Sequence, residues 1–167
     1  MSRKFHLFLL LPVLAVIYAF SSFSSADITW YELKEAQQLA KQNGKKVLIY
    51  AEASWCGYCK KMEAEVFPVQ AVQDSMEKYY YPVRVDIESD KKMLFNGETM
   101  TGSQFARKHR VSGTPTTFFV SRDGKILGAQ PGFIPPKVFK NLLSFVGSGA
   151  FGRIGFEEYV EMHGQKE

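Results

Sequence analysis

Apolar and polar residues follow one another in blocks that predict strands and helices in alternation. Residues 46–51 are mostly β-branched or large apolar residues without Pro or Gly, as in a strand covered on both faces. Before them, apolar residues recur at helical spacing over residues 33–41. Residues 29–32 match the Ser/Thr-x-x-Glu capping box, so the helix is predicted to begin there and to end at Gly44.

The same alternation continues after the strand. Residues 60–67 are good helix formers followed by a proline, and residues 69–78 predict one or two further helical turns. Residues 81–87 are strand-like. Because a helical crossover separates the two strands, the rule of right-handed connections predicts that they pair in parallel.

Residues 88–102 form an insertion in this alternation. The Asn-Gly pair at 96–97 is a strong tight-turn signal, which predicts a small hairpin before the next helix. That helix is expected to run from Ser103, as its cap, to Arg110. His109 is expected at the surface near the helix end, where the helix dipole favours a positive charge.

The C-terminal part of the chain predicts an antiparallel hairpin and a helix. Residues 116–121 and 125–130 flank an Asp-Gly turn, and the prolines at 135–136 suit the first turn of the last main helix. The tail, residues 147–167, is expected to add one short helix that packs on the domain. The whole order predicts an α/β fold with a mixed central sheet flanked by helices on both faces.

The N-terminal stretch has a different pattern. Arg3 and Lys4 precede an apolar run over residues 5–20, and small residues follow as far as Ala26. A basic start, an apolar middle and a small-x-small end predict a secretory signal peptide over residues 1–26, cleaved after Ala26. An uncleaved run would anchor the protein, but it is shorter than the roughly 20 residues of a membrane span.

Length and charge limit the number of domains and the kinds of partner of the mature protein. The chain of 167 residues carries 21 Lys+Arg and 17 Asp+Glu, and without residues 1–26 one domain's length remains. That domain is assigned to residues 27–146, with the insertion at about 88–102. No run of basic residues is long enough to indicate nucleic-acid binding, and a monomer is expected.

The chain has two cysteines, Cys56 and Cys59, which lie between the predicted strand and the next helix. A helix N-terminus carries unsatisfied N–H groups and partial positive charge, so the pKa of Cys56 should be lowered. Cys59 lies one turn further on, on the same face and deeper. The spacing therefore predicts a nucleophilic thiolate at Cys56 and a resolving thiol at Cys59.

A zinc site and a purely structural disulfide both fit the cysteine pair less well. A structural zinc site needs four ligands, whereas there is no second CxxC and His6, His109 and His163 are scattered. A structural disulfide across so short a loop would add little stability. In an exported protein, moreover, a single CxxC indicates action on the disulfides of other proteins. No metal and no other cofactor is therefore expected.

Two motifs, in the right order, resemble the active site of the thioredoxin superfamily. The first is the loop Trp55-Cys56-Gly57-Tyr58-Cys59-Lys60 after a strand, and the second is Val111-Ser112-Gly113-Thr114-Pro115-Thr116 with the hairpin that follows it. The resemblance covers about residues 29–146. It implies the thioredoxin fold, a cis bond before Pro115, and a groove at Thr114 and Pro115 in which an extended substrate pairs beside Cys56. Trp55 is expected to shield the disulfide.

The chain departs from thioredoxins at one position. They carry a buried Asp six residues before the first active cysteine, where this chain has Tyr50. Glu52 lies two residues later, on the same side of the strand. It is either the acid/base group for Cys59, with a raised pKa, or a solvated residue at the strand's end.

Finer resemblances point in two directions. Gly57 and Tyr58, together with Thr114, resemble the site of periplasmic disulfide isomerases, but those proteins need an N-terminal dimerisation domain, for which this chain has only a short helical lead-in. Glu52, the insertion and the proline-rich residues 131–136 look more like exported SoxW-type reductases and the C-terminal domain of the membrane thiol reductase DsbD.

These resemblances imply an exported, periplasmic thiol:disulfide reductase. It would act on disulfide-bearing proteins and be reduced again by a membrane thiol donor. Two alternatives stay open. One is an oxidase or isomerase, which Tyr58 and Thr114 favour, and the other is a chaperone or binding module in which the thiols are incidental.

Overall fold

The computed structural model describes residues 27–163. The predicted signal peptide and the last four residues of the tail lie outside the described residues. Within residues 27–163, no helix has the length and apolar character needed to cross a lipid bilayer. The elements are α1 (Leu33–Asn43), β1 (Lys46–Glu52), α2 (Gly57–Glu65), α3 (Gln70–Tyr79), β2 (Tyr80–Asp86), β3 (Lys92–Phe95), β4 (Glu98–Thr101), α4 (Gly102–Lys108), β5 (Thr116–Val120), β6 (Ile126–Pro131), α5 (Pro136–Gly147) and α6 (Phe156–His163).

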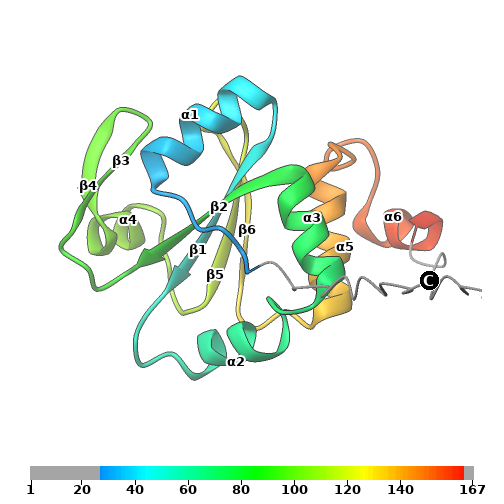
Figure 1. The fold of residues 1–167 in the computed structure, drawn as a ribbon, viewed down its shortest axis with the longest axis horizontal. Coiled ribbons are helices and arrows are strands. Elements are labelled where there is room, and N and C mark those ends of the chain that lie inside the picture. The colour runs from blue at the N-terminus through cyan, green and yellow to red at the C-terminus, as the bar shows by residue number, and fades with distance from the viewer. Residues whose placement is uncertain (1–26, 164–167) are drawn as a thin grey trace, which may run out of the picture.

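A four-stranded sheet in the order β2-β1-β5-β6 forms the centre of the domain (Figure 1). Strand β1 pairs in parallel with β2, and antiparallel with β5 on its other side; β5 pairs antiparallel with β6. At the middle of β1, Ile49 is opposite Val83 on one side and Phe118 on the other. The predicted α/β fold with a mixed sheet is thereby confirmed.

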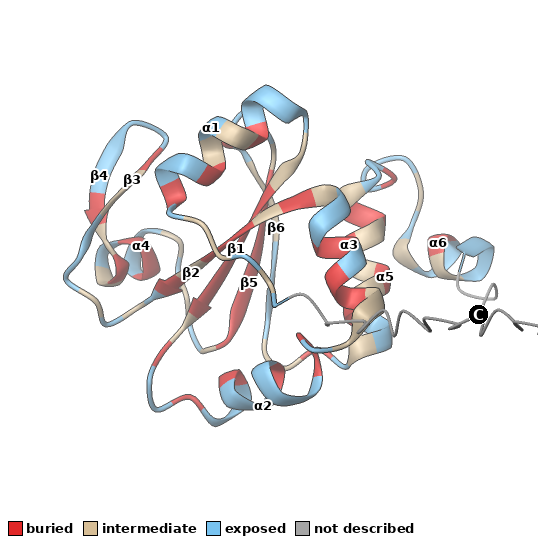
Figure 2. Ribbon diagram, in the orientation of Figure 1, coloured by how far each residue is buried: buried red, intermediate tan, exposed pale blue. Residues whose placement is uncertain are grey.

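Two hydrophobic cores lie on opposite faces of this sheet. Leu48 and Tyr50 of β1 belong to the core that includes residues of α2, α3, α5 and α6, whereas Val47 and Ile49 belong to the core that includes residues of α1, α4 and the β3–β4 hairpin. Alternate β1 residues thus point to opposite cores. Residues 47–51 are all buried, and Figure 2 shows the buried residues gathered along the central strands.

The insertion is a hairpin, as the Asn-Gly signal predicted. Strands β3 and β4 pair with each other in a separate two-stranded sheet, and Asn96 and Gly97 both have positive φ, 52° and 82°, as a tight turn of this kind requires. The Asn96 side chain also donates a hydrogen bond to the Gly124 carbonyl, 2.9 Å away. This contact fastens the tip of the hairpin to the turn before β6.

Two predicted helix starts are wrong. Helix α1 begins at Leu33, after Glu32, whose side chain makes no capping hydrogen bond; the Tyr31 N–H donates to the Pro82 carbonyl instead, at 2.9 Å. This bond ties the segment before α1 to β2 in an extended form. Helix α4 is capped by Thr101 rather than Ser103, since Thr101 forms the reciprocal capping box with Gln104.

His109 lies at the end of α4, as predicted, but it is half-buried and not a surface residue. Its ring packs against Phe95, Phe105 and Phe118, with centroid distances of 5.7, 4.5 and 6.1 Å. Its Nε2 atom is buried without a hydrogen-bond partner. Burial lowers the pKa of His109 below its ordinary value, so the contacts with these rings outweigh the attraction of the helix end for a cation.

Both helices predicted in the C-terminal part of the chain are present. Helix α5 has a proline in its first turn, as expected. The short tail helix is present as α6. Its Phe156 and Tyr159 rings lie 5.4 and 5.3 Å from the ring of Phe145, so α6 packs on α5.

Candidate active site

The cysteine loop lies where β1 meets α2, at one end of the sheet (Figure 1). After β1, a short turn is closed by a hydrogen bond of 3.1 Å from the Cys56 N–H to the Ala53 carbonyl. Cys56 then forms the N-cap of α2, which begins at Gly57. The predicted position of Cys56 at a helix N-terminus is confirmed. Cys59 lies in the first turn of this helix.

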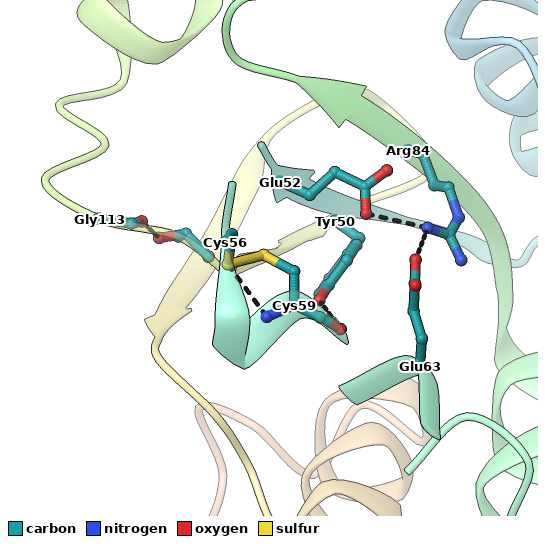
Figure 3. The surroundings of a disulfide bond; sticks show 8 residues. Tyr50, Glu52, Cys56, Cys59, Glu63, Arg84 and Gly113 are labelled. Atoms are coloured by element: carbon teal, nitrogen blue, oxygen red, sulfur yellow. Dashed lines mark hydrogen bonds and ion pairs between the residues drawn. A yellow bond between two sulfur atoms is a disulfide. The ribbon is translucent and has the colours of Figure 1, made fainter. Parts of the chain in front are cut away.

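Cys56 and Cys59 are joined by a disulfide bond, with their Cα atoms 5.2 Å apart. The Cys59 N–H donates to the Cys56 Sγ atom at 3.0 Å (Figure 3). Both cysteines are 3% exposed, whereas the neighbouring Trp55 and Tyr58 are 64% and 61% exposed. After reduction, the same N–H and the positive end of α2 would stabilise a thiolate on Cys56.

The loop before β5 lies next to this disulfide. The Thr114–Pro115 peptide bond is cis, and Gly113 is among the residues that surround the disulfide in Figure 3. The loop is held by two hydrogen bonds of 2.7 Å each: Thr116 Oγ1 donates to the Gly113 carbonyl, and the Gly132 N–H donates to the Pro115 carbonyl. Thr114 Oγ1 is buried without a hydrogen-bond partner.

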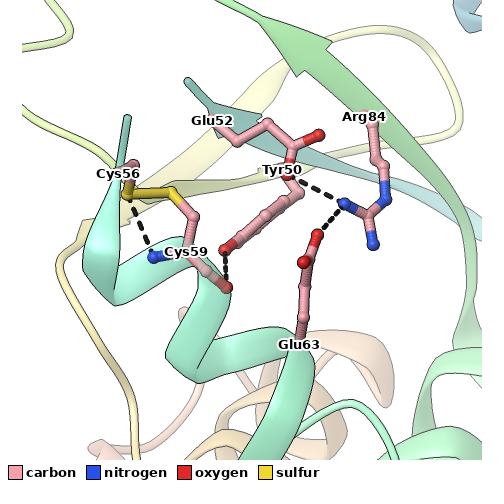
Figure 4. Close-up of polar contacts among 6 residues, drawn as sticks. All are labelled: Tyr50, Glu52, Cys56, Cys59, Glu63 and Arg84. Carbon is pink, nitrogen blue, oxygen red and sulfur yellow. Dashed lines mark hydrogen bonds and ion pairs between the residues drawn. A yellow bond between two sulfur atoms is a disulfide. The ribbon is translucent and has the colours of Figure 1, made fainter. Parts of the chain in front are cut away.

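Glu52 does not lie free at the strand's end. Its carboxylate accepts a hydrogen bond of 2.9 Å from Arg84, and Arg84 also binds Glu63 of α2. Figure 4 shows the Glu52 carboxylate turned toward Arg84, while Tyr50 extends below it toward Cys59. The Tyr50 hydroxyl lies 3.5 Å from the Cys59 carbonyl oxygen, which accepts its hydrogen bond.

Arg84 is itself enclosed by aromatic rings. Its guanidinium lies 4.3 Å from the ring centre of Trp30, and 6.0 and 5.9 Å from those of Tyr50 and Phe67. Trp30 belongs to the extended segment before α1. Because stacking on Trp is favourable for a guanidinium, this segment helps to fix Arg84 between β1 and α2.

The pKa values of Glu52 and Tyr50 are both raised, with different consequences for proton transfer. Burial raises the pKa of Glu52 above its ordinary value, although Arg84 acts in the opposite direction. Burial also raises the pKa of the Tyr50 phenol far above its usual range, and the nearby carboxylates Glu52 and Glu63 add to the effect. Tyr50 therefore stays protonated near neutral pH and cannot accept a proton, whereas Glu52 can.

The structure brings most of the predicted site residues to one end of the sheet, and it adds others. Arg84 and Glu63 were not predicted; the signal for Arg84 was a charged residue between two valines in a predicted strand. Trp30 was assigned only to a helix cap. Phe133, which lies beside Tyr58 with ring centres 6.4 Å apart, belongs to residues 131–136, whose resemblance to exported reductases was noted without a role for this ring. Within residues 27–163, no cluster of three or more His, Cys, Asp or Glu side chains is placed to hold a metal ion.

A disulfide at the start of a helix, beside a cis-proline loop and at the end of a mixed four-stranded sheet, defines the class of thiol:disulfide exchange proteins with a thioredoxin fold. The chain belongs to the family described as "Thioredoxin-like domain", whose model matches residues 33–147. It is a thioredoxin-like thiol:disulfide oxidoreductase.

Individual relatives agree with this assignment. The chain is 25% identical to "Disulfide bond reductase DsbH" of Chlamydia pneumoniae, over 67% of each chain. It is 29% identical to "Thiol:disulfide interchange protein DsbD" of Actinobacillus pleuropneumoniae, over 79% of this chain but 25% of that protein. Among solved structures, a thioredoxin from Thermus thermophilus is similar with a TM-score of 0.62 and 27% identity, over 77% of this chain and 96% of the other. A thioredoxin-fold protein from Helicobacter pylori matches with a TM-score of 0.65 and 22% identity, over 72% and 84%.

Proposed function

We propose that this protein is an exported reductase of protein disulfides, with Cys56 as nucleophile and Cys59 as resolving thiol. The observation that carries the proposal is the position of the Cys56 sulfur. It caps α2, accepts the Cys59 N–H at 3.0 Å, and lies beside the loop that contains cis-Pro115. A thiolate stabilised there can attack a disulfide that is bound along this loop.

The reaction proceeds in two exchanges. The Cys56 thiolate attacks one sulfur of the partner's disulfide; a mixed disulfide forms, and the partner's other sulfur leaves as a thiolate that takes up a proton. Cys59 then loses its proton and attacks Cys56. The Cys56–Cys59 disulfide forms, and the second thiol of the partner is released. Two electrons have passed from the dithiol to the partner, and a membrane dithiol donor must return two to the protein.

Glu52 is proposed as the group that receives the Cys59 proton. Tyr50 occupies the place of the usual carboxylate but remains protonated. Glu52 lies on the same side of β1, and burial raises its pKa toward the range in which it can exchange protons with a thiol. Arg84 holds the carboxylate in place at 2.9 Å, so proton transfer would need a rotation of the Glu52 side chain or a bridging water.

The direction and location of the reaction rest on the relatives and the N-terminal pattern. The name of the Chlamydia relative describes a disulfide bond reductase, which agrees with reduction. The signal-peptide pattern of residues 1–26 supports export. The groove for the partner is assigned to Thr114 and Pro115, since the loop that contains them borders the disulfide.

Trapping tests the proposal directly. Cys59→Ser keeps the nucleophile but cannot resolve the mixed disulfide, so it should accumulate disulfide-linked partners that dithiothreitol releases. Cys56→Ser is the matched control and should trap none. A reduction potential of the Cys56–Cys59 pair near −270 mV, as in thioredoxin, would agree with a reductase, whereas a value near −120 mV would reverse the proposed electron flow. If Cys59→Ser traps no partner, the mechanism is wrong.

A further inference from the structure

Tyr58, which lies between the two cysteines in the sequence, packs beside a second aromatic ring that also contacts a lysine. We call Tyr58, Lys61 and Phe133 the aromatic rim. The ring centres of Tyr58 and Phe133 are 6.4 Å apart, and the Lys61 Nζ atom lies 4.5 Å from the centre of the Phe133 ring. Tyr58 is 61% exposed. The rim therefore presents an apolar surface with a positive charge at its edge.

The loop that contains Phe133 is fixed between the active-site elements. On one side of Phe133, the Gly132 N–H donates to the Pro115 carbonyl at 2.7 Å. On its other side, the Ile134 N–H points at the Met62 sulfur of α2, 3.4 Å away. The rim thus spans the space between the cis-proline loop and α2. The rim therefore lies next to the loop along which the proposed function places the partner.

The charges on α2 are opposite to those that would stabilise the helix. Its first turn has no acidic residue and its last turn has no basic one; Lys60 and Lys61 lie at its middle, and Glu63 and Glu65 follow toward the C-terminus. The helix dipole favours the reverse order. Helix stability therefore does not explain the two lysines, and such local conflicts are expected where a side chain serves function.

Neither glutamate of α2 holds Lys61 tightly. Glu63 is bound by Arg84. Glu65 lies 3.8 Å from Lys61, but both side chains are well exposed, 56% and 44%, so water and salt screen this pair. The Lys61 ammonium is therefore open to a carboxylate of a partner.

We propose that the aromatic rim selects partners that carry an acidic side chain next to the reactive cysteine of their disulfide. The apolar stem of that residue would lie on Phe133 and Tyr58, and its carboxylate would meet Lys61. This inference rests on the proposed function, because it concerns the partner that Cys56 attacks.

Three peptide disulfides, identical except for Glu, Gln or Lys beside the reactive cysteine, test the inference. Each is reduced by the protein at low salt, with dithiothreitol to restore the dithiol, and kcat/KM is measured. Wild type should prefer the Glu peptide over the Lys peptide by about fivefold, the upper range for an exposed ion pair, and salt should weaken the preference. Lys61→Glu should reverse it.

Lys78→Glu is the matched control. Lys78 also lies over an aromatic ring, with its Nζ atom 5.0 Å from the Tyr79 centre, but on α3 rather than at the active site. It should keep the wild-type preference. Because each ratio compares peptides within one variant, a change in the amount of folded protein cancels.

The outcomes separate the two proposals. Equal kcat/KM values for the three peptides with wild type, or an unchanged preference in Lys61→Glu, would overturn the role of the rim and leave the reductase function standing. If wild type reduces none of the peptides, the reductase function fails, and the inference fails with it.

Discussion

Replacing Arg84 with Met removes the guanidinium that binds both Glu52 and Glu63. Met keeps part of the apolar contact with Trp30 but has no charge. Glu52, whose side chain is 19% exposed, is then left without its cation in a partly buried place. We expect Arg84→Met to destabilise the protein and to raise the pKa of Glu52 further.

The size of the effect follows from the burial of the pair. Breaking a fully buried ion pair costs about 3–5 kcal/mol, but Arg84 is 32% exposed, so solvent reduces this cost. Loss of the stacking on Trp30 adds about 0.5–1 kcal/mol. The free energy of unfolding should therefore fall by about 2 kcal/mol at pH 7.

The loss of stability in Arg84→Met should depend on pH. Burial already raises the pKa of Glu52 above its ordinary value of 4.5, and without Arg84 it rises further. Just above pH 4.5, the folded variant then binds more protons than its unfolded chain, so its stability falls as pH rises through this window. Arg84→Met should consequently cost more at pH 7 than at pH 5.

Urea unfolding at the two pH values measures this difference. Lys91→Met is the control, since Lys91 pairs with Glu32 at 2.7 Å but both side chains are about 70% exposed (71% and 69%); it should change stability by less than about 0.5 kcal/mol. Glu52→Gln in the Arg84→Met background should recover part of the loss, because an amide carries no charge. A cost no greater than that of Lys91→Met, or one equal at both pH values, would refute the reasoning.

Two further substitutions test the cores. Burial lowers the pKa of His109 from 6.5, so as pH falls the unfolded chain takes up a proton first, and the stability of wild type drops below about pH 6.5. In urea unfolding, the free energy of unfolding of His109→Phe should therefore rise relative to that of wild type between pH 7.5 and pH 5.5. A difference that stays constant over this range would contradict the prediction. The buried Tyr80 hydroxyl donates to the Leu143 carbonyl at 2.7 Å, so Tyr80→Phe should cost about 1–2 kcal/mol in thermal unfolding. Tyr81→Phe, which loses only an exposed contact with Asn43, should cost clearly less, and equal losses would argue against the role of the buried bond.

Much of the fold could be predicted because local patterns and tertiary contacts agree. The apolar run of β1 is covered on both faces, and the Asn-Gly pair at 96–97 adopts the positive φ angles that its turn needs. The two cysteines could be placed because a strand-to-helix junction puts Cys56 at a helix N-terminus. In each case the information lies within a few consecutive residues.

The features that could not be predicted depend on contacts between segments that are distant in the sequence. The Thr-x-x-Glu pattern at 29–32 failed as a cap because the Tyr31 N–H binds the Pro82 carbonyl, far along the chain. The partner of Glu52 could not be read from β1 alone, since Arg84 comes from β2 and Trp30 from before α1. His109 was misplaced because its neighbours come from three separate segments.

The parallel and antiparallel pairing of β1 has a consequence for the dynamics of the site. Strand β1 has a hydrogen-bonded neighbour on each edge and cores on both faces, so its amide hydrogens should exchange with solvent only through global unfolding. The segment that follows has no such cover. Hydrogen exchange of the oxidised and reduced protein should therefore differ in the first turn of α2, which contains Cys59 and is capped by Cys56, but not in β1.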